Sequence, residues 1–487
     1  MTDDDFKAWL RSGSSRRVVL VEAQANTGSA EEDFWLSNRP YIREDTNIAY
    51  EACIAGGVTF REELSLTGEA SAGFGDIELE NADGSRDEWL THVWANRPVS
   101  VYLGDAQWPR ADFRLIFQGV VADIGDGAET LTLSLLNKLD RLNNPAIEQT
   151  LGGSGDNADE LIPHVLGEVH GMSPLLTSVD QDYKVHGGAI ERIIEARDMG
   201  DPTIVITESL ASGSFRVSGG KVRGQITADV QGAKPGGTYT NNISTLVQHL
   251  VTAYGPSAQR FDAGDLDAAQ LAAFETAYPQ PVGLLMNDNT SVLAHAQSLA
   301  GSVGAQVVCT TLGKLRLIPL ALPAVGTPVV VGPGDMVANT LRPAQRTEVK
   351  AACRLGYCRN WTVQQSGLAT GLPATSSDLL GTEWLTVQAN DSAVAAKYRL
   401  TTEPDQEDTL LLRTVDAQAE CERRRDLWKE PHTVYQAEYY AHMLLTELGD
   451  AITIDHPRYG LAGGKTGLVV SIERDWLAGR VTVGVLI

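Results

Sequence analysis

Residues 75–81 read Gly-Asp-Ile-Glu-Leu-Glu-Asn and indicate the fold most clearly. Ile77 and Leu79 fall on one face of an extended segment, and the acidic residues between them fall on the other. This two-residue period is typical of a strand with one buried face. The turn-like sequence Asn-Ala-Asp-Gly-Ser follows at 81–85, so we expect the strand to end there.

Similar β-like segments lie on both sides of this strand, with turn residues between them. In the first part of the chain they cover 18–23, 64–68, 99–105, 113–124 and 130–136. Short strands at even spacing are typical of an antiparallel barrel or sandwich. The last part of the chain is similar, with expected strands at 434–440, 449–456, 467–473 and 480–487.

Helices are expected where apolar residues recur at helical spacing. These places are a helix capped by Asn242, one at 265–277, one starting near Asn289 and one at 414–428. A hairpin is expected at 305–319 and a strand pair at 347–361. The fold class is therefore β-dominated α+β, with several small antiparallel β-barrel or sandwich domains and inserted helices.

Four domains are expected along the 487 residues, since about 150 residues per domain is common. They are an N-terminal β-barrel domain at 1–146, a second β-rich domain at 147–238, a helical and hairpin domain at 239–340 and a C-terminal β-rich domain at 341–487. The linear pattern leaves open whether these domains are interleaved.

The charge balance is strongly acidic and excludes several classes of function. Asp and Glu number 63 against 39 Lys and Arg, which gives a formal charge of −24. A nucleic-acid reader needs a basic surface to displace counterions, and docking on anionic lipid also needs basic residues. No run of 18 apolar residues suggests a membrane span, and the acidic start lacks the pattern of a signal peptide. We therefore expect synthesis in a cytoplasm and no membrane insertion.

Candidate catalytic motifs do not meet their spacing rules. The loop 460–466 has the wrong glycine count for a Walker A loop and lies between two expected strands. His164 and His170 flank Glu168 without zincin spacing, so satisfied or surface side chains are expected there. His442 and His456 stand in a strand region without a carboxylate motif, and no Gly-x-Ser-x-Gly elbow is present. Catalytic, cofactor-binding and metal-binding residues are therefore all expected to be none.

The cysteines are five in number and scattered, which disfavours a disulfide framework. Cys353, Cys358, Cys421 and Cys309 could hold an iron–sulfur cluster only if the fold gathered them. Buried free thiols are the expected state.

Aromatic residues concentrate in the first part of the chain, where they could pack in a core or stack on sugars. They are Phe34, Trp35, Tyr41, Trp89, Trp94, Tyr102, Trp108, Phe113 and Phe117. Core packing and subunit contacts are the expected role.

Several phrases spread over nearly the whole chain, in this order, resemble a known family. They are 60–68 (FREELSLTG), 75–84 (GDIELENADG), 112–121 (DFRLIFQGVV), 183–189 (YKVHGGA), 224–232 (GQITADVQG), 355–361 (LGYCRNW), 449–450 (GD, ahead of an expected strand) and 456–460 (HPRYG). The chain resembles the baseplate hub or tail-tip structural proteins of tailed bacteriophages with long non-contractile tails, and is similar to the hub proteins of gene transfer particles.

The resemblance implies a virion protein that forms a homotrimeric hub around the DNA exit path. Its implied partners are other copies of itself, the tail tube, the distal tail protein, the tape measure protein and tail fibres, with phage DNA as passing cargo. It implies location at the tail tip or baseplate, after assembly in the host bacterial cytoplasm, and no enzymatic activity. Two other functions remain open: a tail-tip protein that binds a carbohydrate or receptor, and a tail-associated hydrolase.

Overall fold

The computed structural model describes residues 2–12, 16–66, 73–127, 129–178, 181–322 and 326–487. Residue contacts group the chain into two compact units. Unit 1 combines Met1–Arg141, Gln306–Glu348 and Pro431–Ile487, and unit 2 combines Leu142–Ala305 and Val349–Glu430. The units therefore interleave along the chain. The division into four consecutive domains stays a prediction.

Unit 1 is built on one sheet of 15 strands, and the β-dominated α+β class predicted from the sequence is confirmed. A helix, α1 (Asp3–Arg11), precedes the strands. The N-terminal strands are β1 (Arg17–Asn26), β2 (Glu31–Ser37), β3 (Tyr41–Ile42), β4 (Ala49–Ala52), β5 (Ile54–Glu63), β6 (Phe74–Glu80), β7 (Pro98–Asp105), β8 (Arg114–Asp126) and β9 (Thr130–Asn137). The later ones are β20 (Val329–Val331), β21 (Arg342–Arg346), β25 (Thr433–Tyr440), β26 (Ala451–Ile454), β27 (Lys465–Asp475) and β28 (Arg480–Leu486).

The N-terminal strands of unit 1 close into a barrel. β1 pairs with β2 on one side and with β7 on the other, and β8, β9, β6 and β5 follow in order. β4 pairs with β2 and runs on into β5 through Cys53. The Cys53 amide donates to the Ser37 carbonyl at 3.0 Å, and the Cys53 carbonyl accepts from the Glu80 amide at 2.7 Å, which completes the ring of strands.

The strand at 75–81 lies within this barrel as β6, and its side chains alternate as predicted. Ile77 and Leu79 are fully buried, whereas Glu78 and Glu80 are exposed. The apolar face of β6 therefore forms part of the barrel core, and its acidic face points to solvent.

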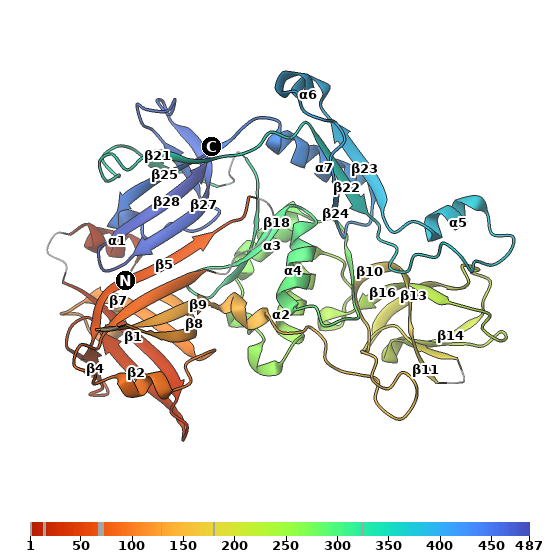
Figure 1. Cartoon of the computed structure of the whole chain (residues 1–487), viewed down its shortest axis with the longest axis horizontal. Helices are drawn as coiled ribbons and strands as arrows, with labels where there is room; N and C mark the ends of the chain where they lie inside the picture. The colour runs from red at the N-terminus through yellow and green to blue at the C-terminus, as the bar shows by residue number, and fades with distance from the viewer. Residues whose placement is uncertain (1, 13–15, 67–72, 128, 179–180, 323–325) are drawn as a thin grey trace. The chain divides into compact units, whose positions relative to one another are not determined.

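The C-terminal strands form the second half of the sheet. β28 lies between β25 and β27, and β21 pairs with the far side of β25. β27 pairs with β26 near its start and with β5 near its end, where Ser471 lies opposite Glu63. The pairing of β5 with β27 joins strands from both ends of the sequence in one sheet. The red-orange and blue strands of Figure 1 show these two halves.

The C-terminal hairpins agree with the sequence pattern. Gly449 and Asp450 precede β26, and β27 pairs antiparallel with β28 with Leu468 opposite Leu486. Gly479 ends the connecting turn with a φ of 65°, a conformation that glycine adopts without strain. Ile487 and Thr433 exchange backbone hydrogen bonds of 3.0 and 2.9 Å, so the last residue is held against β25.

Unit 1 also contains a hairpin formed by β18 (Ala305–Cys309) and β19 (Leu315–Pro319), as predicted from the sequence. The first residue of β18, Ala305, is assigned to unit 2. The turn between the two strands contains Gly313 with a φ of 71°. A short 3₁₀ helix, η8 (Ala441–Met443), follows β25, and α1 packs against it.

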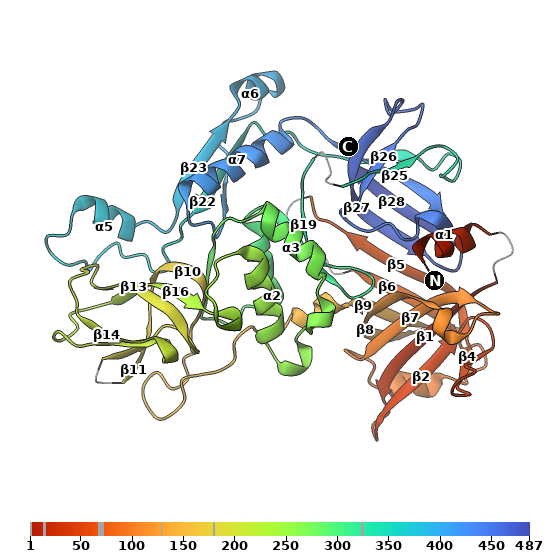
Figure 2. The same cartoon turned by 180° about the vertical axis from the view of Figure 1, so that it is seen from behind.

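Unit 2 contains three further sheets and six α-helices among its described residues. Figure 2 shows these elements from behind. Its strands are β10 (His164–Met172), β11 (Leu175–Ser178), β12 (Asp182–Lys184), β13 (Ile190–Asp198), β14 (Ile206–Ser209), β15 (Ser214–Val217), β16 (Ile226–Ala233), β17 (Gly283–Met286), β22 (Ala352–Tyr357), β23 (Leu385–Asn390) and β24 (Gln406–Asp408). Its helices are α2 (Ile243–Ala253), α3 (Ala268–Ala277), α4 (Val292–Gly301), α5 (Ala374–Leu380), α6 (Ser392–Tyr398) and α7 (Thr414–Trp428).

Two predicted helices of unit 2 are confirmed closely. Asn242 caps α2, because its side chain accepts a hydrogen bond of 2.9 Å from the Ser244 amide. α7 covers the expected 414–428 and packs on β22 and β23, as both views show.

One expectation for unit 2 is wrong. Residues 347–361 contain one strand, β22, and its antiparallel partner β23 comes from residues 385–390. The sequence pattern predicted no strand over 164–172, where the structure has the strand β10. Gly167 and Gly171 interrupt β10 with positive φ angles of 67° and 64°, so the two-residue period is lost there.

None of the helices in the described part of the chain combines the length and apolarity that crossing a bilayer needs.

Candidate functional site

The side chains of Glu168 and His170, singled out from the sequence, belong to an ion-pair network on the sheet of β10, β16 and β13. His170 contacts Glu168 at 3.3 Å and Asp229 of β16 at 3.5 Å. Arg197 of β13 makes a two-pronged contact with Asp229, at 2.9 and 2.6 Å. The side chain of Asp229 is only 9% exposed, so these partners compensate a buried charge.

The network shifts the pKa of each of these side chains in the direction that favours its charged form. Although burial opposes its charge, the hydrogen bonds that the His170 ring donates to the Asp229 and Glu168 carboxylates raise the pKa of His170 to about 9. Burial also opposes the charge of Asp229, but His170 and Arg197 lower the pKa of that carboxyl below its usual value. His170 is thus a satisfied, charged histidine at neutral pH.

His164 belongs to a different group, with His186, His249 and Tyr254. The His164 ring lies 4.8 Å from the His186 ring and 5.2 Å from the Tyr254 ring, between ring centres. The His186 Nδ1 atom accepts a hydrogen bond of 2.9 Å from the Val165 amide, which fixes that nitrogen as unprotonated. Burial lowers the pKa of His164 to about 4 and that of His186 to about 3. These histidines are therefore neutral at pH 7.

We expect the stability of unit 2 to be greatest near pH 6.5. His164 and His186 have folded pKa values below the unfolded value of about 6.5, so their contribution is complete above pH 6.5 and is lost as pH falls towards 4. His170 has a raised pKa, so its contribution is complete below pH 6.5 and is lost as pH rises through 9. Each pKa unit corresponds to about 1.4 kcal/mol. Thermal unfolding measured from pH 4 to 9.5 checks this profile.

Variants separate the two sides of the profile. His170→Gln should flatten the alkaline side of the stability profile and leave the acid side unchanged, whereas His164→Gln should make the acid side less steep, because His186 still contributes there. If the stability profile against pH is unchanged in both variants, His164 and His170 do not cause its two slopes.

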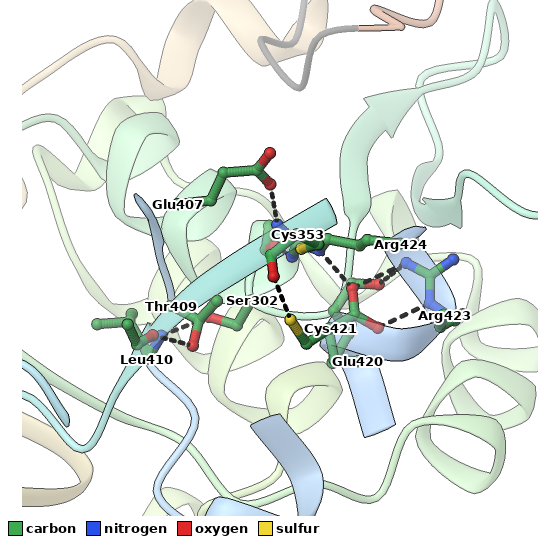
Figure 3. Close-up of polar contacts among 12 residues, drawn as sticks. Ser302, Cys353, Glu407, Thr409, Leu410, Glu420, Cys421, Arg423 and Arg424 are labelled. Carbon is green, nitrogen blue, oxygen red and sulfur yellow. Dashed lines mark hydrogen bonds and ion pairs between the residues drawn. The ribbon is translucent and has the colours of Figure 1, made fainter. Parts of the chain in front are cut away.

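A third polar cluster joins α7 to β22, β24 and the end of α4 (Figure 3). Glu420, Arg423 and Arg424 lie on one helix face, since they are three and four positions apart. Glu420 contacts both arginines at 2.7 Å, and Arg424 also contacts Glu407 at 2.8 Å. Arg424 donates to the Gly301 carbonyl at 2.6 Å, which fixes α7 against the end of α4.

Two thiols lie beside this cluster. The Cys421 thiol donates to the carbonyl oxygen of Cys353 at 3.1 Å, and both residues belong to one apolar cluster with Leu355 and Ala389. Cys358 is half-buried elsewhere on unit 2, and Cys309 belongs to unit 1. The fold therefore brings together two of the four thiols considered for a cluster. Within the described stretches, no group of three or more His, Cys, Asp or Glu side chains is placed to hold a metal ion.

The aromatic residues of the first barrel pack inside it or into its rim. Trp94, Phe113, Phe117 and Tyr41 are buried, and the other five are half-buried. Phe34 contacts Trp89 and Trp94 with ring centres 5.2 and 4.8 Å apart. Core packing, the expected role, is confirmed for these side chains.

The remaining motifs lie in turns and loops. Residues 460–464 form part of the loop between β26 and β27, whose strands pair antiparallel, so the hairpin interpretation is confirmed. Ser212 contacts Ser209 and Ser214 in a turn. His442 lies on η8, between β25 and β26, and contacts Asp335 at 3.1 Å, and His456 lies just after the end of β26.

A buried ion pair in unit 1 was missed by sequence reasoning. Glu62 of β5 and Arg474 of β27 contact at 2.6 Å, with side chains only 8% and 2% exposed. Arg474 also donates to the Leu444 carbonyl at 3.1 Å. A small hollow beside the pair is lined by Glu62, Val308, Cys309, Thr310, Thr311, Arg316, Ile318, Glu447 and Leu448. The partners are 412 positions apart, so no local pattern predicts their contact.

Solved structures of phage tail proteins are similar to this chain. A 43 kDa tail protein of prophage MuSo2 from Shewanella oneidensis has 10% identity and a TM-score of 0.41, over 97% of this chain and 98% of that one. A tail protein from Neisseria meningitidis has 9% identity and a TM-score of 0.39, over 97% of each chain. A prophage tail protein from Listeria monocytogenes has 10% identity and a TM-score of 0.36, over 96% and 94%.

No protein-family model matches the chain, and no curated protein matches it in sequence. All three are tail proteins, and two of them come from prophages. Because all three TM-scores are below 0.5, the function proposed below rests on the sequence resemblance and on the geometry of this chain.

Proposed function

We propose that the chain is a structural protein of a phage tail tip or baseplate, and that three copies form a ring-shaped hub around the path of exiting DNA. The observation that carries this proposal is the single sheet of unit 1. A closed barrel and a second strand group, drawn from opposite ends of the chain, are joined by the pairing of β5 with β27. A subunit with two β-structures in one unit suits a position against a symmetric tube.

Three copies of such a subunit would present six β-structures to a six-fold tail tube. Rings of identical chains form when head-to-tail contacts close on themselves. The net charge of −24 is compatible with a wall around passing DNA, because like charges repel and the DNA does not adhere. The partners in this role are other copies of the chain, the tail tube, the distal tail protein, the tape measure protein and tail fibres. The role places the protein in the virion after assembly in the host cytoplasm.

The proposed role requires no catalysis. The clusters on β10 and α7 are composed of paired charges that hold strands and helices together. The aromatic side chains of the first barrel are buried or half-buried, and their packing accounts for their concentration in this part of the chain.

The mass of the purified protein tests the proposed assembly. Light scattering after size exclusion is expected to give three times the 52.3 kDa of one chain. A concentration series at low and high salt shows whether the assembly is closed. A mass of 52.3 kDa at every concentration would contradict the trimer.

A further inference from the structure

After β21 the chain passes from unit 1 into unit 2, and it re-enters unit 1 just before β25. We call the unit 2 segment between these points, residues 349–430, the excursion. The base of this excursion is held by a hydrogen bond of 2.9 Å from the Lys350 amide to the Trp428 carbonyl. Cys353 lies three residues after Lys350, and Cys421 lies seven residues before Trp428. The two cysteines are therefore 68 positions apart, and the chain between them makes up most of the excursion.

The local geometry places the two cysteines on facing elements. Cys421 lies on α7 and is fully buried, and Cys353 lies on β22 with 6% exposure. The Cys421 thiol contacts the Cys353 backbone at 3.1 Å, and Figure 3 shows its side chain directed at that strand. Val387 and Leu355 complete the apolar surroundings.

We propose that Cys353 and Cys421 form a disulfide when the protein meets an oxidising medium, and that this bond locks α7 to β22 at the base of the excursion. In the step, the Cys421 thiolate attacks one sulfur of a small-molecule disulfide, and a mixed disulfide and one free thiol result. The Cys353 thiolate then displaces the second small thiol. The two cysteines are oxidised, the small disulfide is reduced to two thiols, and the two cysteine protons are taken up by those thiols.

The proposal gives the pair a place in the life of the particle, and in that respect it rests on the proposed function. Thiols stay reduced in a cytoplasm, where assembly takes place, and disulfides persist outside the cell. A released particle would thus gain a covalent link within unit 2 without change to the subunit contacts. A bond that closes a loop of this length restricts the unfolded chain strongly.

Thiol counting tests the bond directly. The full-length protein is incubated with oxidised glutathione, unfolded, alkylated and weighed. We expect three of its five cysteines to be alkylated, and a peptide map in which residues 353 and 421 are linked. Cys421→Ala should lose the link, whereas the control Cys358→Ser should keep it. Five alkylated cysteines, or a link that joins Cys358, would overturn the proposal.

Unfolding gives a second readout that does not depend on the variants. The oxidised wild-type protein should unfold roughly 5–10 °C above the reduced protein, and Cys421→Ala should show no such difference. An equal unfolding temperature in both states of the wild type would overturn the locking role. Because both measurements use the isolated chain, a linked protein that stays monomeric would contradict the trimeric hub and leave the disulfide standing.

Discussion

Deletion of residues 480–487 is expected to leave the protein without a folded C-terminal half of unit 1. The deletion removes β28, which lies between β25 and β27, and its loss leaves one edge of each of these two strands without a partner. Val481, Val483, Val485 and Leu486 are all fully buried. Burial of such a side chain contributes about 1.5–3 kcal/mol, so the loss is roughly 6–12 kcal/mol. A folded domain has only about 5–15 kcal/mol of stability.

Soluble yield, circular dichroism and limited proteolysis measure the effect of this deletion. We expect cleavage within residues 431–479, which the intact protein resists. Thr482→Ala is the matched control, because Thr482 is a half-buried residue of the same strand and its loss should cost less than about 1 kcal/mol. A truncated protein that stays soluble and resists protease as the full chain does would show that β28 is dispensable.

Arg474→Met is expected to destabilise unit 1 by about 3–5 kcal/mol, because it leaves the buried Glu62 carboxylate without its partner. Denaturant unfolding of the wild type and the variant measures this loss. The double variant Arg474→Met with Glu62→Met should recover part of it, since removal of both charges leaves no unpaired one. Glu473→Gln changes the exposed neighbour on the same strand and should have an effect within about 0.5 kcal/mol.

A loss below about 1 kcal/mol for Arg474→Met would show that the ion pair does not hold β5 and β27 together. Equal losses for the single and double variants would assign the effect to packing at residue 474, because Arg474 also contacts the Leu444 carbonyl.

Local patterns predicted the elements whose burial is periodic. β6 alternates between buried and exposed side chains, and α2 has both a cap residue and an apolar face, so each was visible in a short window. β10 was missed because two glycines with positive φ break its period. The partner of β22 was also missed, since β23 lies 28 positions beyond the end of β22 and no short window contains both strands.

The contacts that matter most for the proposed role join residues far apart in sequence. Glu62 and Arg474 are separated by 412 positions, and Cys353 and Cys421 by 68. No motif marks such partners in a single sequence, because their spacing is set by the path of the whole chain. His170 was correctly expected to be a satisfied histidine, but its partner Asp229 could be identified only from the pairing of β10 with β16.

Electron microscopy of the purified full-length protein tests the central claim most directly. We predict ring-shaped particles with three-fold symmetry and a central opening wide enough for duplex DNA, with the β-barrels of unit 1 around it. Particles of single-chain size without an opening, at concentrations where light scattering also gives a monomer, would contradict the proposed hub.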